Sequence, residues 1–171
     1  CKLISQHADS MGAPTACESA GVPNVSYNGS TLDACPNTFI VSSRINWVPY
    51  MKYMIECVRD NKAIDTDWCK GINEGAVELT PINEKVAAPG TAEAIKAAEE
   101  QFKAGTLHVF DTSTFTVDGK TLTSYMADVD TDEKFTPDTE VISNGYFHES
   151  EKRSAPYFDV NIDGITLLNE G

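Results

Sequence analysis

The sequence is 171 residues long, with 41% apolar residues, 23% charged residues and a formal net charge of −13 at pH 7. This composition is ordinary for a globular domain, and the length is sufficient for one well-buried core. The acidic balance repels phosphate backbones and anionic headgroups, and no cluster of Lys or Arg offsets it. The longest apolar runs, such as residues 38–42, are far shorter than the roughly 20 residues that cross a bilayer. We therefore expect no nucleic-acid partner and no membrane span.

The first part of the chain predicts alternating strands and helices. Apolar runs bounded by turn residues predict strands at residues 3–6, 24–27, 39–42 and 75–80, and helical periodicity predicts helices at residues 11–20, at 47–61 and from Thr91 to a stop at Gly105. Asp9 or Ser10 is the expected N-cap of the first helix. Short connections with helical crossovers predict an α/β fold with a doubly wound, mostly parallel sheet. Ligands of such sheets bind outside the carboxyl ends of the strands.

Apolar sides and cysteines indicate which side chains enter the core. The helix over residues 47–61 has an apolar side formed by Val48, Met51, residues 53–55 and Val58. Five cysteines show no CxxC pair and no Cys/His spacing typical of zinc: Cys1, Cys17, Cys35, Cys57 and Cys69. We expect them to be small buried side chains, with Cys17 and Cys57 on the apolar sides of helices, and we expect neither a disulfide framework nor a structural metal.

The last third of the chain has weaker periodicity. Residues 116–121 predict a β-hairpin with a tight turn at Asp118-Gly119. Residues 128–137 predict an acidic loop, and residues 157–168 predict one or two edge strands.

The loop Gln6-His7-Ala8-Asp9-Ser10 is the strongest candidate for a ligand site. It follows a buried strand and opens a helix, so its backbone N–H groups and short polar side chains face the crevice where a ligand would lie. The Asp9 carboxylate can accept hydrogen bonds from two vicinal hydroxyls or from an exocyclic amino group, whereas helix capping needs only one oxygen. The position of Asp9 alone favours ligand binding and helix capping equally.

Two further segments follow strands and add aromatic and amide groups. Tyr27 either stacks on an aromatic ligand or covers the sheet, and Asn28 can both donate to and accept from a base edge or a hydroxyl. Asn46 and Trp47 stand at a strand-to-helix junction, where an indole beside amide donors suits a planar heterocycle. A core position is the alternative for Trp47. Arg44 either pairs with a carboxylate or faces the crevice.

Residues 67–90, DWCKGINEGAVELTPINEKVAAPG, and the segment ISQHADS at residues 4–10 resemble the basic membrane protein family. These are extracytoplasmic substrate-binding proteins of bacterial ABC importers, with mostly purine nucleoside and nucleobase ligands. The run Trp47-Val48-Pro49-Tyr50 is also similar to the family pattern. The resemblance covers residues 2–110, the expected α/β core, whereas the tail at residues 111–171 matches loosely. Where many relatives have an Asp-containing loop, this chain has Asn28, which weakens the expectation of a standard ribose contact.

The resemblance implies a type I periplasmic-binding-protein-like fold, of which this chain is the carboxyl-terminal portion. A purine nucleobase or nucleoside would bind between two lobes, against Gln6, His7, Asp9, Ser10, Tyr27, Asn28, Asn46 and Trp47. It also implies a monomer that docks on ABC transporter membrane subunits and uses no cofactor. Anchoring would occur outside the cytoplasm through a lipidated N-terminus upstream of Cys1, because Cys1 matches an internal strand of the family and the sequence begins without Met or a signal peptide.

Two other functional classes remain open. A sensory or regulatory domain that binds a sugar or another small molecule shares this fold and differs in what precedes it. An enzyme that uses Cys17 or His7 is disfavoured, because a reactive thiol needs electropositive surroundings and the local charge is acidic.

Overall fold

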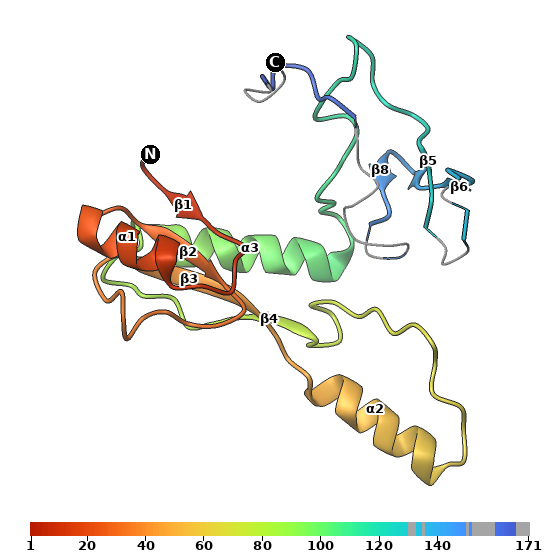
Figure 1. Cartoon of the computed structure of the whole chain (residues 1–171), viewed down its shortest axis with the longest axis horizontal. Helices are drawn as coiled ribbons and strands as arrows, with labels where there is room; N and C mark the ends of the chain where they lie inside the picture. Colours follow the sequence, from red (N-terminus) through yellow and green to blue (C-terminus); the bar gives the residue numbers. More distant parts are fainter. Residues whose placement is uncertain (130–132, 135, 150, 152–159, 167–171) are drawn as a thin grey trace. The chain divides into compact units, whose positions relative to one another are not determined.

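The computed structural model describes residues 1–129, 133–134, 136–149, 151 and 160–166. The chain divides into two compact units, Cys1–Ala104 and Gly105–Gly171. The first unit is a mixed α/β structure built around a four-stranded sheet, and the second contains short antiparallel strand pairs. Figure 1 shows the elements in chain order.

The sheet of the first unit has the strand order β1-β2-β3-β4. Its members are β1 (Ile4–Ser5), β2 (Asn24–Tyr27), β3 (Phe39–Ile45) and β4 (Val77–Leu79). The pairs β1–β2 and β2–β3 are parallel, and β4 runs antiparallel to β3. The predicted mostly parallel α/β sheet is therefore confirmed. β3 is longer than predicted, because Ser43, Arg44 and Ile45 pair with β4 across the sheet although they do not form an apolar run.

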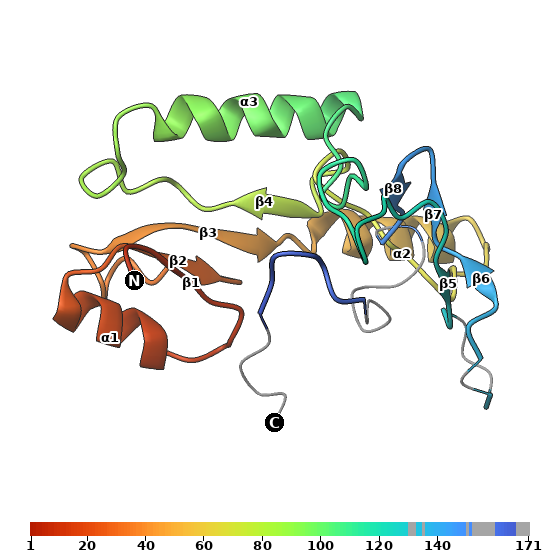
Figure 2. The same cartoon turned by 90° about the horizontal axis from the view of Figure 1, so that it is seen from above.

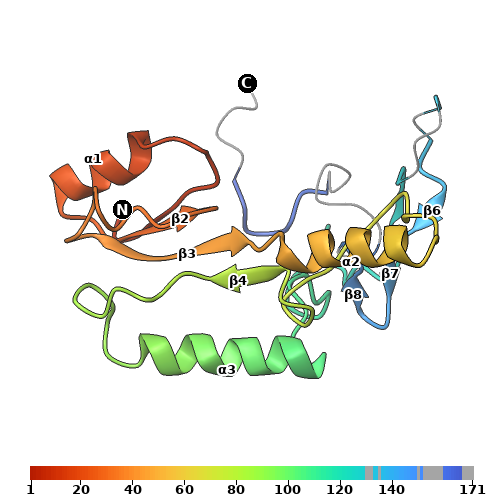
Figure 3. The same ribbon diagram turned by 90° about the horizontal axis from the view of Figure 1, so that it is seen from below.

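Three helices accompany this sheet: α1 (Gly12–Ala20), α2 (Val48–Arg59) and α3 (Thr91–Ala104). Figures 2 and 3 show α1 and α3 on opposite sides of the sheet. α1 ends at Gly21, whose left-handed φ of 65° forms the usual glycine stop. The expected N-cap at Asp9 or Ser10 is wrong, because the helix begins after Met11 and no side chain caps it. Met11 holds the N-cap position instead, and its side chain has no oxygen to accept from the first N–H groups of the helix.

The core of the first unit combines apolar and polar side chains. Phe39 is fully buried, and Val41, Cys17 and Ala76 are at least nine-tenths buried. Cys17 and Cys57 are buried as predicted, and so is Cys35. The expectation that all five cysteines are buried is wrong for Cys1 and Cys69, which lie exposed in terminal and loop segments; none of the five forms a disulfide.

A continuous set of hydrogen bonds satisfies the buried polar side chains of Asn24, Ser26 and Thr38. The Asn24 side-chain amide donates to the Thr38 hydroxyl at 3.0 Å, and the Ser26 hydroxyl donates to the Asn24 side-chain oxygen at 3.2 Å. The Thr38 hydroxyl in turn donates to the Glu18 carboxylate at 2.7 Å. Since a buried polar group without a partner costs about 1–3 kcal/mol, this network is what permits polar residues inside the sheet.

Glu18 at the end of α1 gives a pH-dependent contribution to stability. Its carboxylate accepts hydrogen bonds from the Thr38 hydroxyl and from the backbone and side-chain N–H groups of Asn37. The Thr38 hydrogen bond is the main reason that the pKa of Glu18 lies below its ordinary value of 4.5; the Asn37 donors add to this lowering, and desolvation opposes it. A carboxylate with a lower pKa in the folded state stabilises the fold above its unfolded pKa, and this stabilisation is lost as pH falls through the folded pKa.

We therefore expect Glu18→Gln to reduce the loss of stability on acidification. Denaturant unfolding of the wild-type chain at a series of pH values below 4.5 should show a steeper decline in the free energy of unfolding than the variant shows. Glu84→Gln, which removes an exposed carboxylate outside the network, is the matched control. Parallel pH profiles for wild type and Glu18→Gln would show that these hydrogen bonds do not hold Glu18 ionised.

The apolar side of α2 is exposed rather than packed. Val48, Met51, Ile55 and Val58 are 69%, 47%, 68% and 73% exposed, whereas the opposite side contacts the connection that follows the helix. There, the ring of Trp68 lies 5.1 Å from that of Tyr50 and 6.2 Å from that of Tyr53, measured between centroids. The periodicity therefore groups Val48, Met51, Ile55 and Val58 on one side of α2, but that side is exposed. Tyr53, which was predicted on the same side, belongs to the aromatic side that packs.

The described part of the second unit contains two strand pairs: β5 (Met126–Ala127) with β6 (Thr139–Glu140), and β7 (Ile142–Ser143) with β8 (Tyr146–Phe147). Ala127, Val141, Ile142 and Phe147 form its buried cluster. The predicted hairpin is confirmed, since Val117 bridges Lys120 and both turn residues, Asp118 and Gly119, have positive φ.

The remaining tail predictions are tested only in part. The four short strands of the second unit were not predicted. Edge strands were expected at residues 157–168, of which 157–159 and 167–168 lie outside the described residues; the described part forms a turn instead of a strand. Asp163 in this turn accepts hydrogen bonds from the Thr116 hydroxyl and the Gly119 N–H, so it supports the hairpin loop. The acidic loop at 128–137 is likewise described only in part.

Candidate functional site

The carboxyl ends of β1 and β2 meet at one edge of the sheet and bring two aromatic rings together. The two strands are parallel, and the Gln6 N–H donates to the Val25 carbonyl at 3.2 Å, which extends their pairing by one residue. Beyond this point the rings of His7 and Tyr27 stack, with centroids 4.0 Å apart and planes inclined by 25°. His7 is exposed and Tyr27 is half-buried, so the pair presents an aromatic surface at the sheet edge. We call these two side chains the ring pair.

Gln6, which precedes His7 in the chain, has an unsatisfied side-chain acceptor. Its side-chain amide nitrogen donates to the Ser10 carbonyl at the long distance of 3.5 Å. Its Oε1 atom is buried and has no hydrogen-bond partner within the described residues. A buried acceptor in this state is destabilising by about 1–3 kcal/mol, so an N–H or O–H donor supplied by a ligand would be stabilising there.

Asn28 follows Tyr27 in a left-handed conformation with φ of 61°. Asn adopts this region more readily than most residues because its short polar side chain can hydrogen-bond locally. The Asn28 N–H donates to the Ser43 carbonyl at 2.7 Å, which fixes its backbone beside the end of β3. The residue is exposed, so its side-chain amide can reach a ligand at the same edge as the ring pair.

Asp9 and Ser10 lie in the exposed turn between β1 and α1. Because neither side chain caps α1, the capping role that competed with ligand binding at Asp9 is absent. Its carboxylate is on the surface of the loop that follows the ring-pair edge. The structure therefore brings His7 and Tyr27 into contact, with Gln6 and Asn28 next to them in the chain, and keeps Asp9 and Ser10 on the adjoining loop.

Asn46 and Trp47 lie beyond the end of β3, where α2 begins. The Asn46 side-chain oxygen accepts a hydrogen bond from the Val48 N–H at 3.1 Å, so this amide supports the start of α2. Trp47 is 59% exposed and meets the ring of Tyr50 edge-on, with centroids 6.3 Å apart. The indole is therefore not buried in the core, so the core position that was the alternative for Trp47 is excluded. Arg44 forms an ion pair with Glu78 across β3 and β4, so the pairing alternative holds for Arg44.

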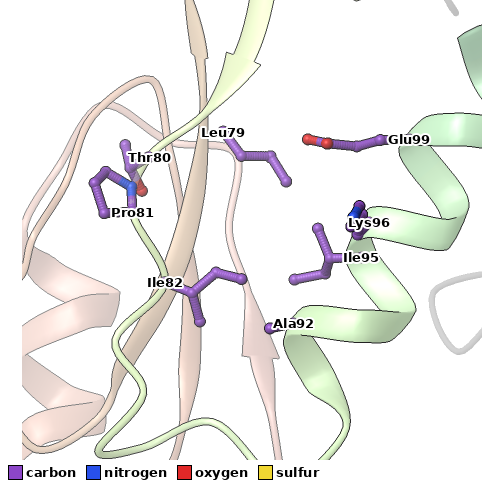
Figure 4. Close-up of a pocket in the computed structure, with 8 residues that line it drawn as sticks. All are labelled: Leu79, Thr80, Pro81, Ile82, Ala92, Ile95, Lys96 and Glu99. Atoms are coloured by element: carbon purple, nitrogen blue, oxygen red, sulfur yellow. The ribbon is translucent and has the colours of Figure 1, made fainter.

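A separate groove of about 380 Å³ lies between β4 and α3. Figure 4 shows its lining, which consists of Leu79, Thr80, Pro81, Ile82, Ala92, Ile95, Lys96 and Glu99. None of the predicted site residues belongs to it. The lining is mostly apolar and offers few convergent polar groups, and no residue of α3 is buried. We interpret the groove as loose packing of α3 against the β4 segment rather than as a built ligand site.

Among residues 1–129, 133–134, 136–149, 151 and 160–166, no three His, Cys, Asp or Glu side chains come close enough together to hold a metal ion. Over the same residues, no helix has both the length and the apolar character needed to traverse a bilayer.

Comparison with known proteins finds similarity to solved structures. No family model matches the sequence, and no curated protein matches it. The chain is similar to a solved ABC transporter system solute-binding protein from Conexibacter woesei DSM 14684. The identity is 18%, the TM-score is 0.48, and the alignment covers 63% of this chain. This chain spans 37% of the length of that protein.

Proposed function

We propose that this chain is the carboxyl-terminal portion of an extracytoplasmic substrate-binding component of an ABC importer, of the basic membrane protein type, and that its ligand is a purine nucleobase or nucleoside. The ring pair is the observation that most supports this proposal, because it places an aromatic surface at the carboxyl edge of parallel strands. Ligands of open α/β sheets bind at this edge. The motifs at residues 4–10 and 67–90 support the same family.

The groups around the ring pair suit a planar ligand that donates hydrogen bonds. Base–aromatic stacking contributes about 1–3 kcal/mol per base in nucleic-acid binders. The Gln6 Oε1 atom can accept from an exocyclic amino group or a ring N–H, and the Asn28 amide can both donate and accept. The Asp9 carboxylate can accept from the hydroxyls of a ribose, which would favour a nucleoside over a free base.

Transport would follow from closure around the ligand. In the proposed two-lobed protein, the ligand bridges both lobes and binds the closed state more tightly than the open one. The membrane subunits of the importer then recognise the closed state, and a lipidated N-terminus keeps the monomeric receptor at the outer face of the membrane. Asn46 and Trp47, at the point where β3 passes into α2, would contact the ligand from the side facing the second lobe.

A thermal-shift screen of the full-length protein tests the proposal. We expect adenine, other purine bases or nucleosides to raise the unfolding temperature, while riboflavin and simple sugars leave it unchanged. Binding to the folded state alone adds about 2.7 kcal/mol to stability when the ligand is at 100 times its Kd. Asp9→Ala and Trp47→Ala should reduce the purine effect, and Asp33→Ala, which removes an exposed carboxylate from another loop, should preserve it. Stabilisation by sugars alone, or by no compound, would contradict the proposed ligand class.

A further inference from the structure

The second unit contains a serine, a histidine and a glutamate joined in series by hydrogen bonds. The Nε2 atom of His148 lies 2.7 Å from the hydroxyl oxygen of Ser143. The Nδ1 atom of the same ring lies 2.7 Å from Oε1 of Glu151. A hydroxyl, an imidazole and a carboxylate in this order form the arrangement that activates a serine for nucleophilic attack, and it recurs on unrelated folds.

Local structure fixes the imidazole and leaves the hydroxyl accessible. Ser143 ends β7 and pairs with Tyr146 of β8 across a tight turn. The ring of Tyr146 stacks on that of His148, with centroids 4.1 Å apart. The side chain of His148 is 11% exposed, whereas Ser143 lies on the surface. A base held by packing beside an exposed hydroxyl is the geometry that covalent chemistry on an external substrate requires.

The turn itself is anchored to the chain that precedes it. The Gly145 carbonyl accepts hydrogen bonds from the N–H and the hydroxyl of Thr112 at 2.8 Å and 2.9 Å. Asn144 and Gly145 both have positive φ, as a two-residue hairpin turn of the primed type requires. The N–H of Asn144 follows the serine directly, and in nucleophile elbows the N–H at this position helps to stabilise the oxyanion.

The hydrogen-bond partners determine which nitrogen can act as the base. A carboxylate only accepts, so the Nδ1 atom facing Glu151 carries the proton, and in the neutral ring Nε2 is free to accept the Ser143 hydroxyl proton. The Ser143 carbonyl oxygen also lies 3.2 Å from Nε2, farther than the hydroxyl. In the protonated ring, Nε2–H can donate to either oxygen, and the three residues then only hold the hairpin closed. The nucleophilic role and the structural role therefore differ in whether the Ser143 hydroxyl is reactive.

We propose that Ser143, His148 and Glu151 form a nucleophilic site that hydrolyses small, unhindered carboxylic esters. This activity concerns residues outside the ring-pair edge and does not depend on the proposed ligand. In the first step, Ser143 Oγ bonds to the ester carbonyl carbon while its proton passes to His148 Nε2. The carbon–oxygen bond to the leaving group then breaks, and the leaving alcohol takes that proton. Water next attacks the acyl-serine with His148 as base, releasing the carboxylic acid and restoring the Ser143 hydroxyl.

The open surroundings define the substrate class. Ser143, Asn144 and Gly145 are all exposed, so the described residues of the site offer no deep wall that would bind a long acyl chain or a bulky leaving group. Short acyl groups on reactive leaving groups are therefore the expected substrates. Glu151 is a positioning residue, since it contacts His148 and not the reacting atoms.

Labelling with a fluorophosphonate probe, followed by peptide mass spectrometry, tests the proposal on the full chain. We expect the adduct on Ser143 and, in parallel, slow turnover of p-nitrophenyl acetate. Ser143→Ala should lose the adduct, and His148→Gln should lower the labelling rate by about 100-fold or more. Glu151→Gln should lower it by about 10-fold or more. Ser113→Ala is the matched control, because Ser113 is an exposed serine hydrogen-bonded to Asp111 at 2.6 Å rather than to a histidine, and its labelling rate should equal that of the wild type.

The pH profile separates catalysis from a structural role. Labelling of the wild type should be faster at alkaline than at acidic pH, and this difference should disappear in His148→Gln. Glu151 is 66% exposed, so Glu151→Gln tests the series even if Ser143→Ala fails to fold. Absence of an adduct on Ser143, or an equal labelling rate in His148→Gln, would overturn the proposal. A wild type that is not labelled, together with a Ser143→Ala variant that only unfolds at lower temperature, would assign the three residues to closing the hairpin.

Discussion

Replacing Phe39 with alanine should lower the free energy of unfolding by about 3–5 kcal/mol. Phe39 is fully buried in β3, and its removal leaves a cavity under the sheet in addition to the lost transfer free energy. Its carbonyl also accepts a hydrogen bond from the Asn83 side chain at 2.9 Å, so a shift of the β3 backbone would disturb a second buried group. Because domains are stable by only about 5–15 kcal/mol, this single change should remove a large part of the total.

Equilibrium unfolding in urea measures the effect, with Phe39→Leu and Ile55→Ala as comparisons. Phe39→Leu keeps part of the volume and should be less destabilising than alanine. Ile55 is 68% exposed on α2, so Ile55→Ala should change the free energy of unfolding by no more than about 0.5 kcal/mol. Equal effects of Phe39→Ala and Ile55→Ala would show that the β3 core is not the main source of stability in the first unit.

Replacing Tyr27 with alanine in the full-length protein should weaken binding of the proposed purine ligand by about 10- to 100-fold. Loss of a stacking ring removes about 1–3 kcal/mol in base–aromatic contacts, and about 1.4 kcal/mol corresponds to a tenfold change in Kd. The change also leaves the His7 ring without the partner that holds it at the sheet edge. Titration calorimetry with the purine compound that gives the largest thermal shift measures the affinity.

Tyr27→Phe is the matched variant, because it keeps the ring and removes only the hydroxyl. We expect its affinity to stay close to that of the wild type. If Tyr27→Ala binds a purine as tightly as the wild type, the ring pair is not the ligand surface, even though the protein would still be a purine receptor. This outcome separates an error in the site from an error in the function.

The sequence predicted the elements whose local signals agree with their packing. β2 was predicted at its observed bounds, and α1 was predicted to within one residue, because an apolar segment, a glycine stop and a following proline all indicate the same boundaries. The stacking of His7 on Tyr27 could not be predicted from residue order alone. It depends on the register of two parallel strands that lie far apart in the chain.

The failures have physical causes that are visible at particular residues. The cap at Asp9 or Ser10 was an error in the helix boundary, since α1 begins at Gly12 and Met11 is its N-cap residue. The hairpin at Asn144-Gly145 was missed although this dipeptide is among the strongest short-range hairpin signals. The exposed side of α2 is different, because periodicity identifies an apolar side but does not show what covers it. The series Ser143, His148 and Glu151 also required the hairpin before its order could be recognised.

The polar network in the first unit limits how this chain can change during evolution. Glu18, Thr38, Asn24 and Ser26 form one line of hydrogen bonds from the surface of α1 to the interior of the sheet. A single replacement in this line removes a hydrogen bond from a neighbouring side chain, whereas simultaneous replacement by apolar groups of the same shape can be nearly neutral. Substitutions at these four positions are therefore expected to occur together, so that in diverged copies of this fold the line is either retained whole or lost whole.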